Sequence, residues 1–120
     1  MNIAQALYSF WAGFGLDAYD EKSVPDEAQM PYITYETITD DFGSPVASTA
    51  NIFYRSTSWV DVSTKAMQIE SAIGNGGKIV PFDDGAFWIV KGHPFSQRLK
   101  DSNDDSVRDI VINVGIEFIR

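Results

Sequence analysis

The chain has 120 residues, of which 44% are hydrophobic and 13% aromatic, and this composition predicts a folded domain with its own core. It contains no cysteine, which excludes a disulfide framework, a thiolate metal site and a cysteine nucleophile. The net charge of −8 disfavours binding to DNA or RNA, because the phosphates must be neutralised by Lys and Arg.

The first predicted element is a helix over residues 2–14. Its apolar side chains recur at helical spacing and form one face, at Ile3, Leu7, Phe10 and Phe14. Asn2 is placed to cap this helix, and Gly13 or Gly15 to end it. Residues 16–31 are polar and acidic and contain two prolines, which predicts a connection rather than a helix or strand.

Two strands and a second helix are expected next. Residues 32–38 and 47–56 are rich in β-branched and aromatic residues, and the turn-forming residues 40–45 lie between them. Residues 62–73 again place apolar side chains on one helical face. We expect Asp61 to cap this helix, Trp59 to lie near the position of a hydrophobic staple, and the glycines of residues 74–77 to end it.

The last third of the chain predicts strands. Residues 78–82 and 86–91 form a hairpin around Asp83-Asp84-Gly85, and Gly92-His93-Pro94 is expected to break the chain. Residues 108–120 predict a half-buried strand with alternate apolar residues at Ile110, Ile112, Val114, Ile116 and Phe118. This strand and residues 47–56 are long, and both are expected to have free edges.

These elements predict an α+β fold. It consists of a mainly antiparallel sheet with an N-terminal helix and a central helix packed against it.

The sequence contains no recognisable catalytic or metal-binding motif. His93 is the single histidine and lies in a predicted turn, without a nucleophile in a recognisable motif. Residues 101–105 begin like a calcium loop, but Ser106 stands where glycine is needed and Ile112 where the bidentate glutamate is needed. The sequence therefore predicts no enzyme, no cofactor and no metal site. A hydrolase built around His93 stays open as an alternative.

No apolar run approaches the roughly 20 residues that a membrane span requires. The N-terminal residues lack the basic region and small-residue cleavage site of a signal peptide. We therefore expect a soluble protein that is made and used inside a cell, with no membrane partner.

Acidic residues are concentrated in the first half of the chain. Residues 1–50 hold eight acids and one base, a net of −7, whereas residues 51–120 hold nine acids and eight bases, a net of −1. Two interpretations remain open. The acids aid solubility, or they form a face that meets a basic partner or repels passing DNA.

The arrangement resembles the small tail-terminator, or tail-completion, proteins of long-tailed bacteriophages and of phage-derived tail particles of Gram-positive hosts. In the first half, the resemblance is carried by Tyr19 through Val24-Pro25, by Pro31 to Tyr35, and by Trp59 before the 62–73 helix with its Gly-Gly exit. In the second half it is carried by residues 85–92, Pro94-Phe95, Gln97, Asp101, Asp105, Arg108 and Ile112-Asn113-Val114. It extends over nearly the whole chain, although Arg98-Leu99-Lys100 and the acidic first half depart from the pattern.

This resemblance implies that residues 1–120 form a single tail-terminator-like domain with a structural role. Such proteins form a ring, typically a homohexamer, on the last ring of tail-tube subunits. The ring stops tube polymerisation and provides the surface for the head–tail connector, and for sheath protein if the tail is contractile. The expected location is the head-proximal end of the virion tail, after assembly in the host cytoplasm.

The resemblance also implies candidate sites. The candidate interface residues are Trp88, Phe95, Gln97, Arg98 and Arg108. The candidate lumen-facing acids, which would let DNA pass without specific binding, are Asp40, Asp41, Asp83 and Asp84. A turn residue that faces solvent is the favoured explanation of each of these aspartates. A small non-catalytic adaptor domain that binds a single protein partner is the alternative function.

Overall fold

Two helices and six strands make up the part of the chain that the computed structural model describes, residues 1–38, 45–99 and 104–119. The elements, in chain order, are α1 (Ile3–Ala12), β1 (Asp17–Asp20), β2 (Tyr32–Tyr35), β3 (Val46–Arg55), α2 (Val60–Ile73), β4 (Lys78–Phe82), β5 (Gly85–Leu99) and β6 (Val107–Ile119). The strands form one sheet in the order β1-β2-β3-β6-β5-β4. Among the described strand pairs, β1 with β2 is the parallel one. The predicted α+β fold with a mainly antiparallel sheet is confirmed.

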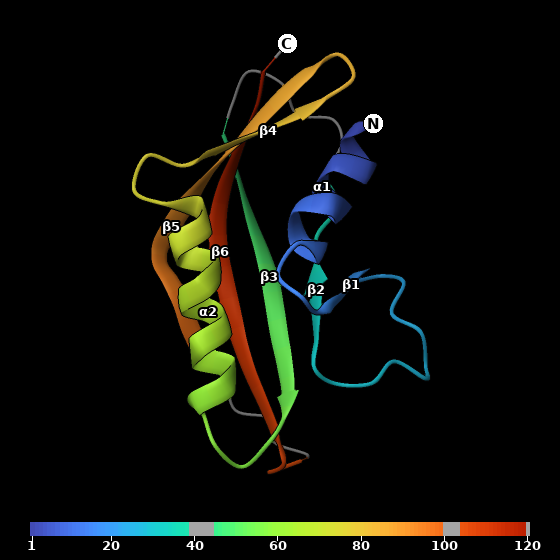
Figure 1. The fold of residues 1–120 in the computed structure, drawn as a ribbon, viewed down its shortest axis with the longest axis vertical. Helices are drawn as coiled ribbons and strands as arrows, with labels where there is room; N and C mark the ends of the chain where they lie inside the picture. The colour runs from blue at the N-terminus through green and yellow to red at the C-terminus, as the bar shows by residue number, and fades with distance from the viewer. Residues whose placement is uncertain (39–44, 100–103, 120) are drawn as a thin grey trace.

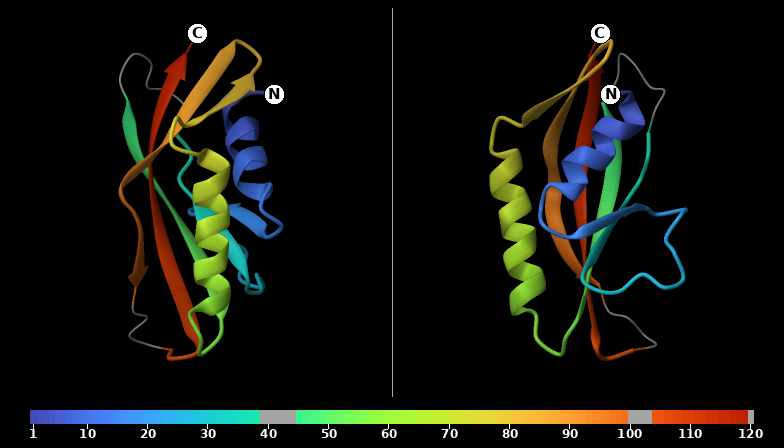
Figure 2. Two further views of the ribbon diagram at one scale, coloured as in Figure 1. Left: turned by 60° about the vertical axis from the view of Figure 1, so that its left-hand side comes forward. Right: turned by 45° about the vertical axis from the view of Figure 1, so that its right-hand side comes forward.

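Both helices cover the same face of the sheet, which we call the helix face (Figures 1 and 2). α2 packs over β5 and β6, and α1 packs over β1 and β2 with its first turn near β4. The alternating apolar residues of β6 point into this layer, as the period of two predicts. The core includes Leu7, Trp11, Ile69, Ile112 and Ile116, each nearly fully buried.

The opposite face, which we call the open face, carries no helix among the described residues (Figure 2). Its side chains are partly exposed. Three aromatic rings form a ladder across β1, β2 and β3, with centroids 5.7 Å apart between Tyr19 and Tyr32 and 5.2 Å apart between Tyr32 and Phe53. The sheet is therefore one layer, packed on one side and half-exposed on the other.

The start of α1 is explained by local hydrogen bonds. The side chain of Asn2 accepts from the backbone N–H of Gln5, and the side chain of Gln5 accepts from the backbone N–H of Asn2, which forms a capping box. The predicted cap at Asn2 is confirmed, and the helix ends at Gly13 as expected.

The predicted cap of the second helix is wrong. α2 begins at Val60 with Trp59 at the N-cap position, and Asp61 lies inside the first turn. There its negative charge complements the positive end of the helix dipole without a capping hydrogen bond. The backbone N–H of Val60 instead donates to Oγ of Ser58 at 3.1 Å.

Residues 17–20 form the strand β1, although the sequence predicted a connection there. The strand pairs with only β2 and buries Ala18, while its acidic neighbours stay at the surface. With one apolar position inward among four residues, no period-two signal could develop. Pairing to β2 and packing against α1 decide its conformation.

The expected break at Gly92-His93-Pro94 is also wrong, because β5 runs through it. The pairing with β6 shifts register between Lys91 and Ser96, and this bulge holds the proline where no ladder donor is required. The side chain of Asn113 donates to the carbonyl of Pro94 at 3.0 Å. The backbone of Gly92 lies so close to Asn113 that a Cβ there would be 2.8 Å from its carbonyl oxygen.

The free edges differ from those predicted. β6 is a central strand that pairs with β3 on one side and β5 on the other, so it has no free edge. β3 pairs with β2 only over residues 50–53, which leaves its first part without a strand on that side. Among the described strands the edges are β1, β4 and the end of β5 beyond its pairing with β4.

None of the helices in the described part of the chain has the length and apolar character needed to cross a membrane.

The turn before β4 provides a test of the packing at this end of the sheet. Gly77 has φ +82°, and a Cβ on it would overlap Nε1 of Trp88 and lie 2.8 Å from the carbonyl oxygen of Ile89. We expect Gly77→Ala to lower the free energy of unfolding by about 1–3 kcal/mol, measured by urea denaturation. Gly76→Ala is the matched control, because a Cβ there meets no atom within 4 Å. Equal denaturation midpoints for the two variants would contradict this packing.

Candidate interaction site

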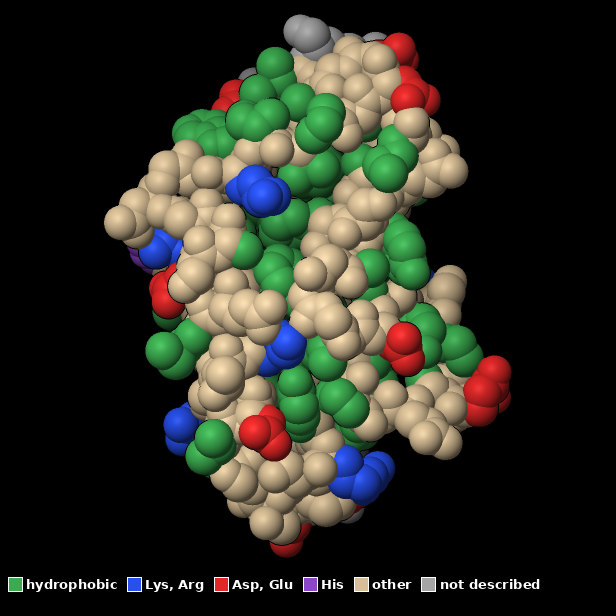
Figure 3. Space-filling view, viewed as in Figure 1, with side chains coloured by type: hydrophobic (Ala, Val, Ile, Leu, Met, Phe, Trp, Pro, Cys, Tyr) green, Lys and Arg blue, Asp and Glu red, His purple; other side chains and the backbone are tan. Residues whose placement is uncertain are grey.

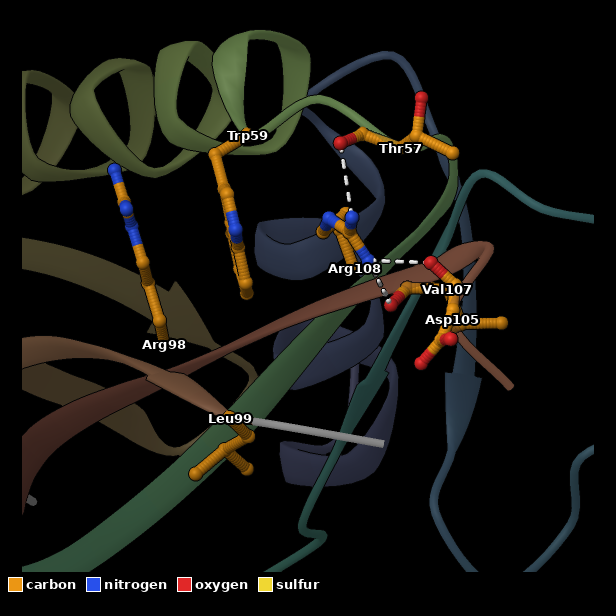
Figure 4. Close-up of a pocket in the computed structure, with 7 residues that line it drawn as sticks. All are labelled: Thr57, Trp59, Arg98, Leu99, Asp105, Val107 and Arg108. Atoms are coloured by element: carbon orange, nitrogen blue, oxygen red, sulfur yellow. Dashed lines mark hydrogen bonds between the residues drawn. The ribbon is translucent and has the colours of Figure 1, made fainter. Parts of the chain in front are cut away.

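Three side chains from distant parts of the sequence stack where β5 ends and β6 begins (Figure 4). The Cζ atom of Arg98 lies 4.9 Å from the centroid of the Trp59 ring, and that of Arg108 lies 5.3 Å from it. The indole stands between the two guanidinium groups, and we call this group the Arg–Trp–Arg stack. Each such contact contributes about 0.5–1 kcal/mol at an exposed site.

The fold positions each member of the stack. Trp59 is the N-cap residue of α2 and so lies directly above the sheet. Arg98 pairs with Ile110 across β5 and β6, and Ile110 is buried on the helix face. Arg108 precedes Ile110 by two positions and therefore lies on the same face. The register of two strands and the start of one helix thus bring the three side chains together.

Arg108 is held by neutral acceptors. Its Nη1 donates to the backbone carbonyls of Asp105 at 2.7 Å and Val107 at 3.2 Å, and its Nη2 donates to that of Thr57 at 2.9 Å. Its Nε is buried and has no hydrogen-bond partner among the described residues. No described carboxylate pairs with Arg108 or with Arg98. Among the described residues, therefore, neither arginine of the stack forms an ion pair, although Asp105 lines the same cleft.

The stack lines a cleft of about 550 Å³. Thr57, Leu99, Asp105 and Val107 complete its walls (Figure 4). A second groove, of about 260 Å³, lies between α2 and β5 and includes Met67, Phe95 and Arg98. Arg98 thus borders both hollows, and the exposed side chains of Leu99 and Met67 add apolar surface beside it.

The turn before β6 sets the carbonyls that hold Arg108. Oδ1 of Asp104 accepts from the backbone N–H of Ser106 at 2.8 Å and from its hydroxyl at 2.6 Å. Oδ2 of Asp104 accepts from Arg55 at 3.1 Å. The bonds from Ser106, followed by that from Arg55, lower the pKa of the Asp104 carboxyl to about 2.

The structure brings some of the predicted interface residues together and separates others. Arg98 and Arg108 share the stack, and Phe95 lies in the adjoining groove. Gln97 pairs with Val111 and belongs to the open face. Trp88 lies toward the other end of β5, where its Nε1 donates to the carbonyl of Gly76 at 2.9 Å. Whether any of them contacts another subunit stays a prediction.

The sequence did not predict Trp59, the third residue of the stack, as an interface residue. Its position before a helix indicated a staple, and nothing in the local pattern connects it to residues 98 and 108. Only strand register and the path of α2 make that connection.

The structure describes two of the four candidate lumen-facing acids. Asp83 and Asp84 are exposed in the turn between β4 and β5. The carboxylate of Asp83 forms an ion pair with the amino group of Met1, and its backbone N–H donates to the Met1 carbonyl at 2.7 Å. Asp40 and Asp41 lie outside the described residues.

His93 is exposed on the bulged part of β5 and has no hydrogen bond within the described ranges. Over the same ranges, no three His, Asp or Glu side chains are grouped so that they could hold a metal ion.

Comparison with solved structures finds a similar fold. A chain in the virion of a native gene transfer agent particle superimposes with a TM-score of 0.62 at 13% sequence identity. The match covers 99% of this chain and 92% of the other, so the two folds correspond over almost their full lengths. No family model matches the sequence, and no curated protein matches it.

The Asp104 turn predicts a pH dependence of stability. A carboxyl whose pKa is lowered on folding stabilises the protein above its ordinary value of 3.8, and this contribution is lost as the pH falls through about 2. We expect Asp104→Asn to lower the melting temperature near neutral pH, and its difference from wild type to shrink between about pH 4 and pH 2. Asp105→Asn is the control, because the side chain of Asp105 forms no hydrogen bond or ion pair among the described residues. Profiles that stay parallel down to pH 2 would contradict the assignment.

Proposed function

We propose that this protein is a structural virion protein, a tail terminator that forms a ring on the end of the tail tube. The observation that carries the proposal is the similarity of fold to a chain of a gene transfer agent virion, which extends over nearly all of both chains. The pattern of residues shared with tail terminators supports the same conclusion independently. Residues 1–120 would then form a single terminator domain without catalytic activity.

The arrangement of edges supports ring formation. A closed ring needs a heterologous interface, in which two different surfaces of each subunit meet. β1 lies at one border of the sheet, and the end of β5 lies toward the other. In the proposal, Phe95, Arg98 and Arg108 contribute to the contact between neighbouring subunits.

A terminator also needs separate surfaces above and below the ring, so that it accepts the tube but refuses another tube layer. Trp88 and Gln97 lie away from the Arg–Trp–Arg stack, and we assign them to these other contacts. The tube protein would bind one surface and the head–tail connector the other, with sheath protein as a further partner if the tail is contractile.

We place the acidic turns at the lumen. Asp83 and Asp84 are exposed, and Asp40 and Asp41 are assigned to the same wall from sequence alone. A wall of negative charge would let DNA pass without sticking, because it removes the attraction of phosphate for the protein. The protein would assemble in the host cytoplasm and remain at the head-proximal end of the tail.

Native mass measurement with and without tube protein tests the ring. We expect a hexamer, either alone or once tube protein is added, because the tube end provides a template for the ring. A monomer that ignores tube protein would contradict the proposal and favour a single-partner adaptor domain.

Deletion of the gene in the native host tests the role in the particle. Overlong tails without heads are expected, because nothing would stop tube polymerisation or join the head. Complementation with the intact gene is the control, and tails of normal length in the deletion strain would rule out a terminator.

A further inference from the structure

Neither arginine of the Arg–Trp–Arg stack forms an ion pair within the described part of the subunit. Arg108 is committed to backbone carbonyls, whereas Arg98 makes no hydrogen bond or ion pair there beyond its contact with Trp59. The guanidinium of Arg98 is thus presented on an aromatic ring with its donors available. Stacking restricts its rotamers in advance, so that less entropy is lost when an anion binds.

The complementary charge lies on the connection between β1 and β2. Glu21, Asp26 and Glu27 are exposed and have no ion pair within the described residues. The connection is ordered by its own hydrogen bonds, including Ser23 N–H to the Asp20 carbonyl at 2.9 Å. It projects from the body of the molecule, and acidic side chains are visible on the projection (Figures 1 and 3).

The stack and the acidic projection lie on opposite sides of the subunit. The stack is beside α2 and the end of β5, and the projection extends beyond β1 and β2 at the other border of the sheet (Figure 1). In the described fold this segment lies away from the subunit's own cleft. A second copy can bring the segment to the cleft, and such a contact is heterologous, as ring formation requires.

We propose that the Arg–Trp–Arg cleft binds the acidic β1–β2 connection of a neighbouring copy of this chain, with Arg98 forming a bidentate contact to a carboxylate. This inference rests on the proposed ring, for which it names the subunit contact. Charge complementarity is the reason for proposing this acidic connection as the segment that binds in the cleft. The first 50 residues carry a net charge of −7. Copies of the chain therefore repel each other unless that half meets a basic site.

Apolar contacts support the same pairing. Leu99 is 41% exposed in the wall of the cleft, and Met67 is 66% exposed in the adjoining groove between α2 and β5. The acidic connection carries Val24 and Pro25 between its carboxylates. An arginine and a tryptophan surrounded by apolar contacts that exclude water form the usual composition of an interface hot spot.

A peptide binding experiment tests the contact on the purified protein. The probe is a fluorescently labelled peptide of residues 16–31, titrated with the full chain and followed by anisotropy. We expect saturable binding that weakens as salt is added, and a loss of about tenfold or more with Arg98→Glu. The matched control is Lys78→Glu, which makes the same charge change at an exposed residue of β4 and should leave binding within about twofold, because it lies outside the cleft.

Reversed charges distinguish a specific contact from general attraction. A peptide with Asp26→Lys and Glu27→Lys should bind wild type poorly and recover affinity for the Arg98→Glu protein. Unfolding curves of both protein variants establish that they fold, and Arg98→Gln provides a neutral variant of similar length. Absence of saturable binding, or equal losses in Arg98→Glu and Lys78→Glu, would overturn the proposal.

The peptide binding experiment and the gene deletion test different claims and can fail separately. If the peptide binds as described but deletion leaves tails of normal length, the contact stands and the terminator role falls. If deletion gives overlong tails but an Arg98→Glu gene restores normal ones, the role stands and this contact falls.

Discussion

The packing of both helices against one face of the sheet, whose central strand is β6, is the constraint on which the remaining structure depends. Every second side chain of β6 is buried beneath the helices, from Ile110 to Phe118. Burial of each large apolar side chain stabilises the folded state by about 1.5–3 kcal/mol. A shift of the strand by one residue would move the whole set to the other face of the sheet and expose it. The register of β3 and β5 on either side is fixed by the same burial.

This one-sided packing determines where the subunit can interact. The helix face is occupied by core contacts, and the central strands are paired on both sides. What remains for other molecules is the open face, the edge strands, and the ends of the sheet where turns and helix termini meet. The Arg–Trp–Arg stack occurs at such an end, because fixed registers place Arg98 and Arg108 on the helix face beside Trp59, the N-cap residue of α2.

This end of the sheet carries the two arginines of the stack, although the protein as a whole has a net charge of −8. The carbonyls of Thr57, Asp105 and Val107 hold Arg108, which forms no ion pair among the described residues. The turn that supplies two of those carbonyls is itself held by Asp104, whose carboxylate is bound to Ser106 and Arg55. An ion pair next to the stack therefore serves to position it, and the acidic surface elsewhere provides the complement that an assembling protein requires.

The amino-acid sequence by itself determined the elements whose signals are local. The capping box at Asn2, the apolar face of residues 62–73, the hairpin around Asp83-Asp84-Gly85 and the alternation of β6 each depend on neighbours within a few positions. The tertiary structure decided the rest. β1 exists because β2 and α1 support it, and β5 continues through Pro94 because a bulge removes the need for its missing N–H. The stack joins residues 59, 98 and 108, and contacts over such separations follow from strand register and helix placement, which no local pattern encodes.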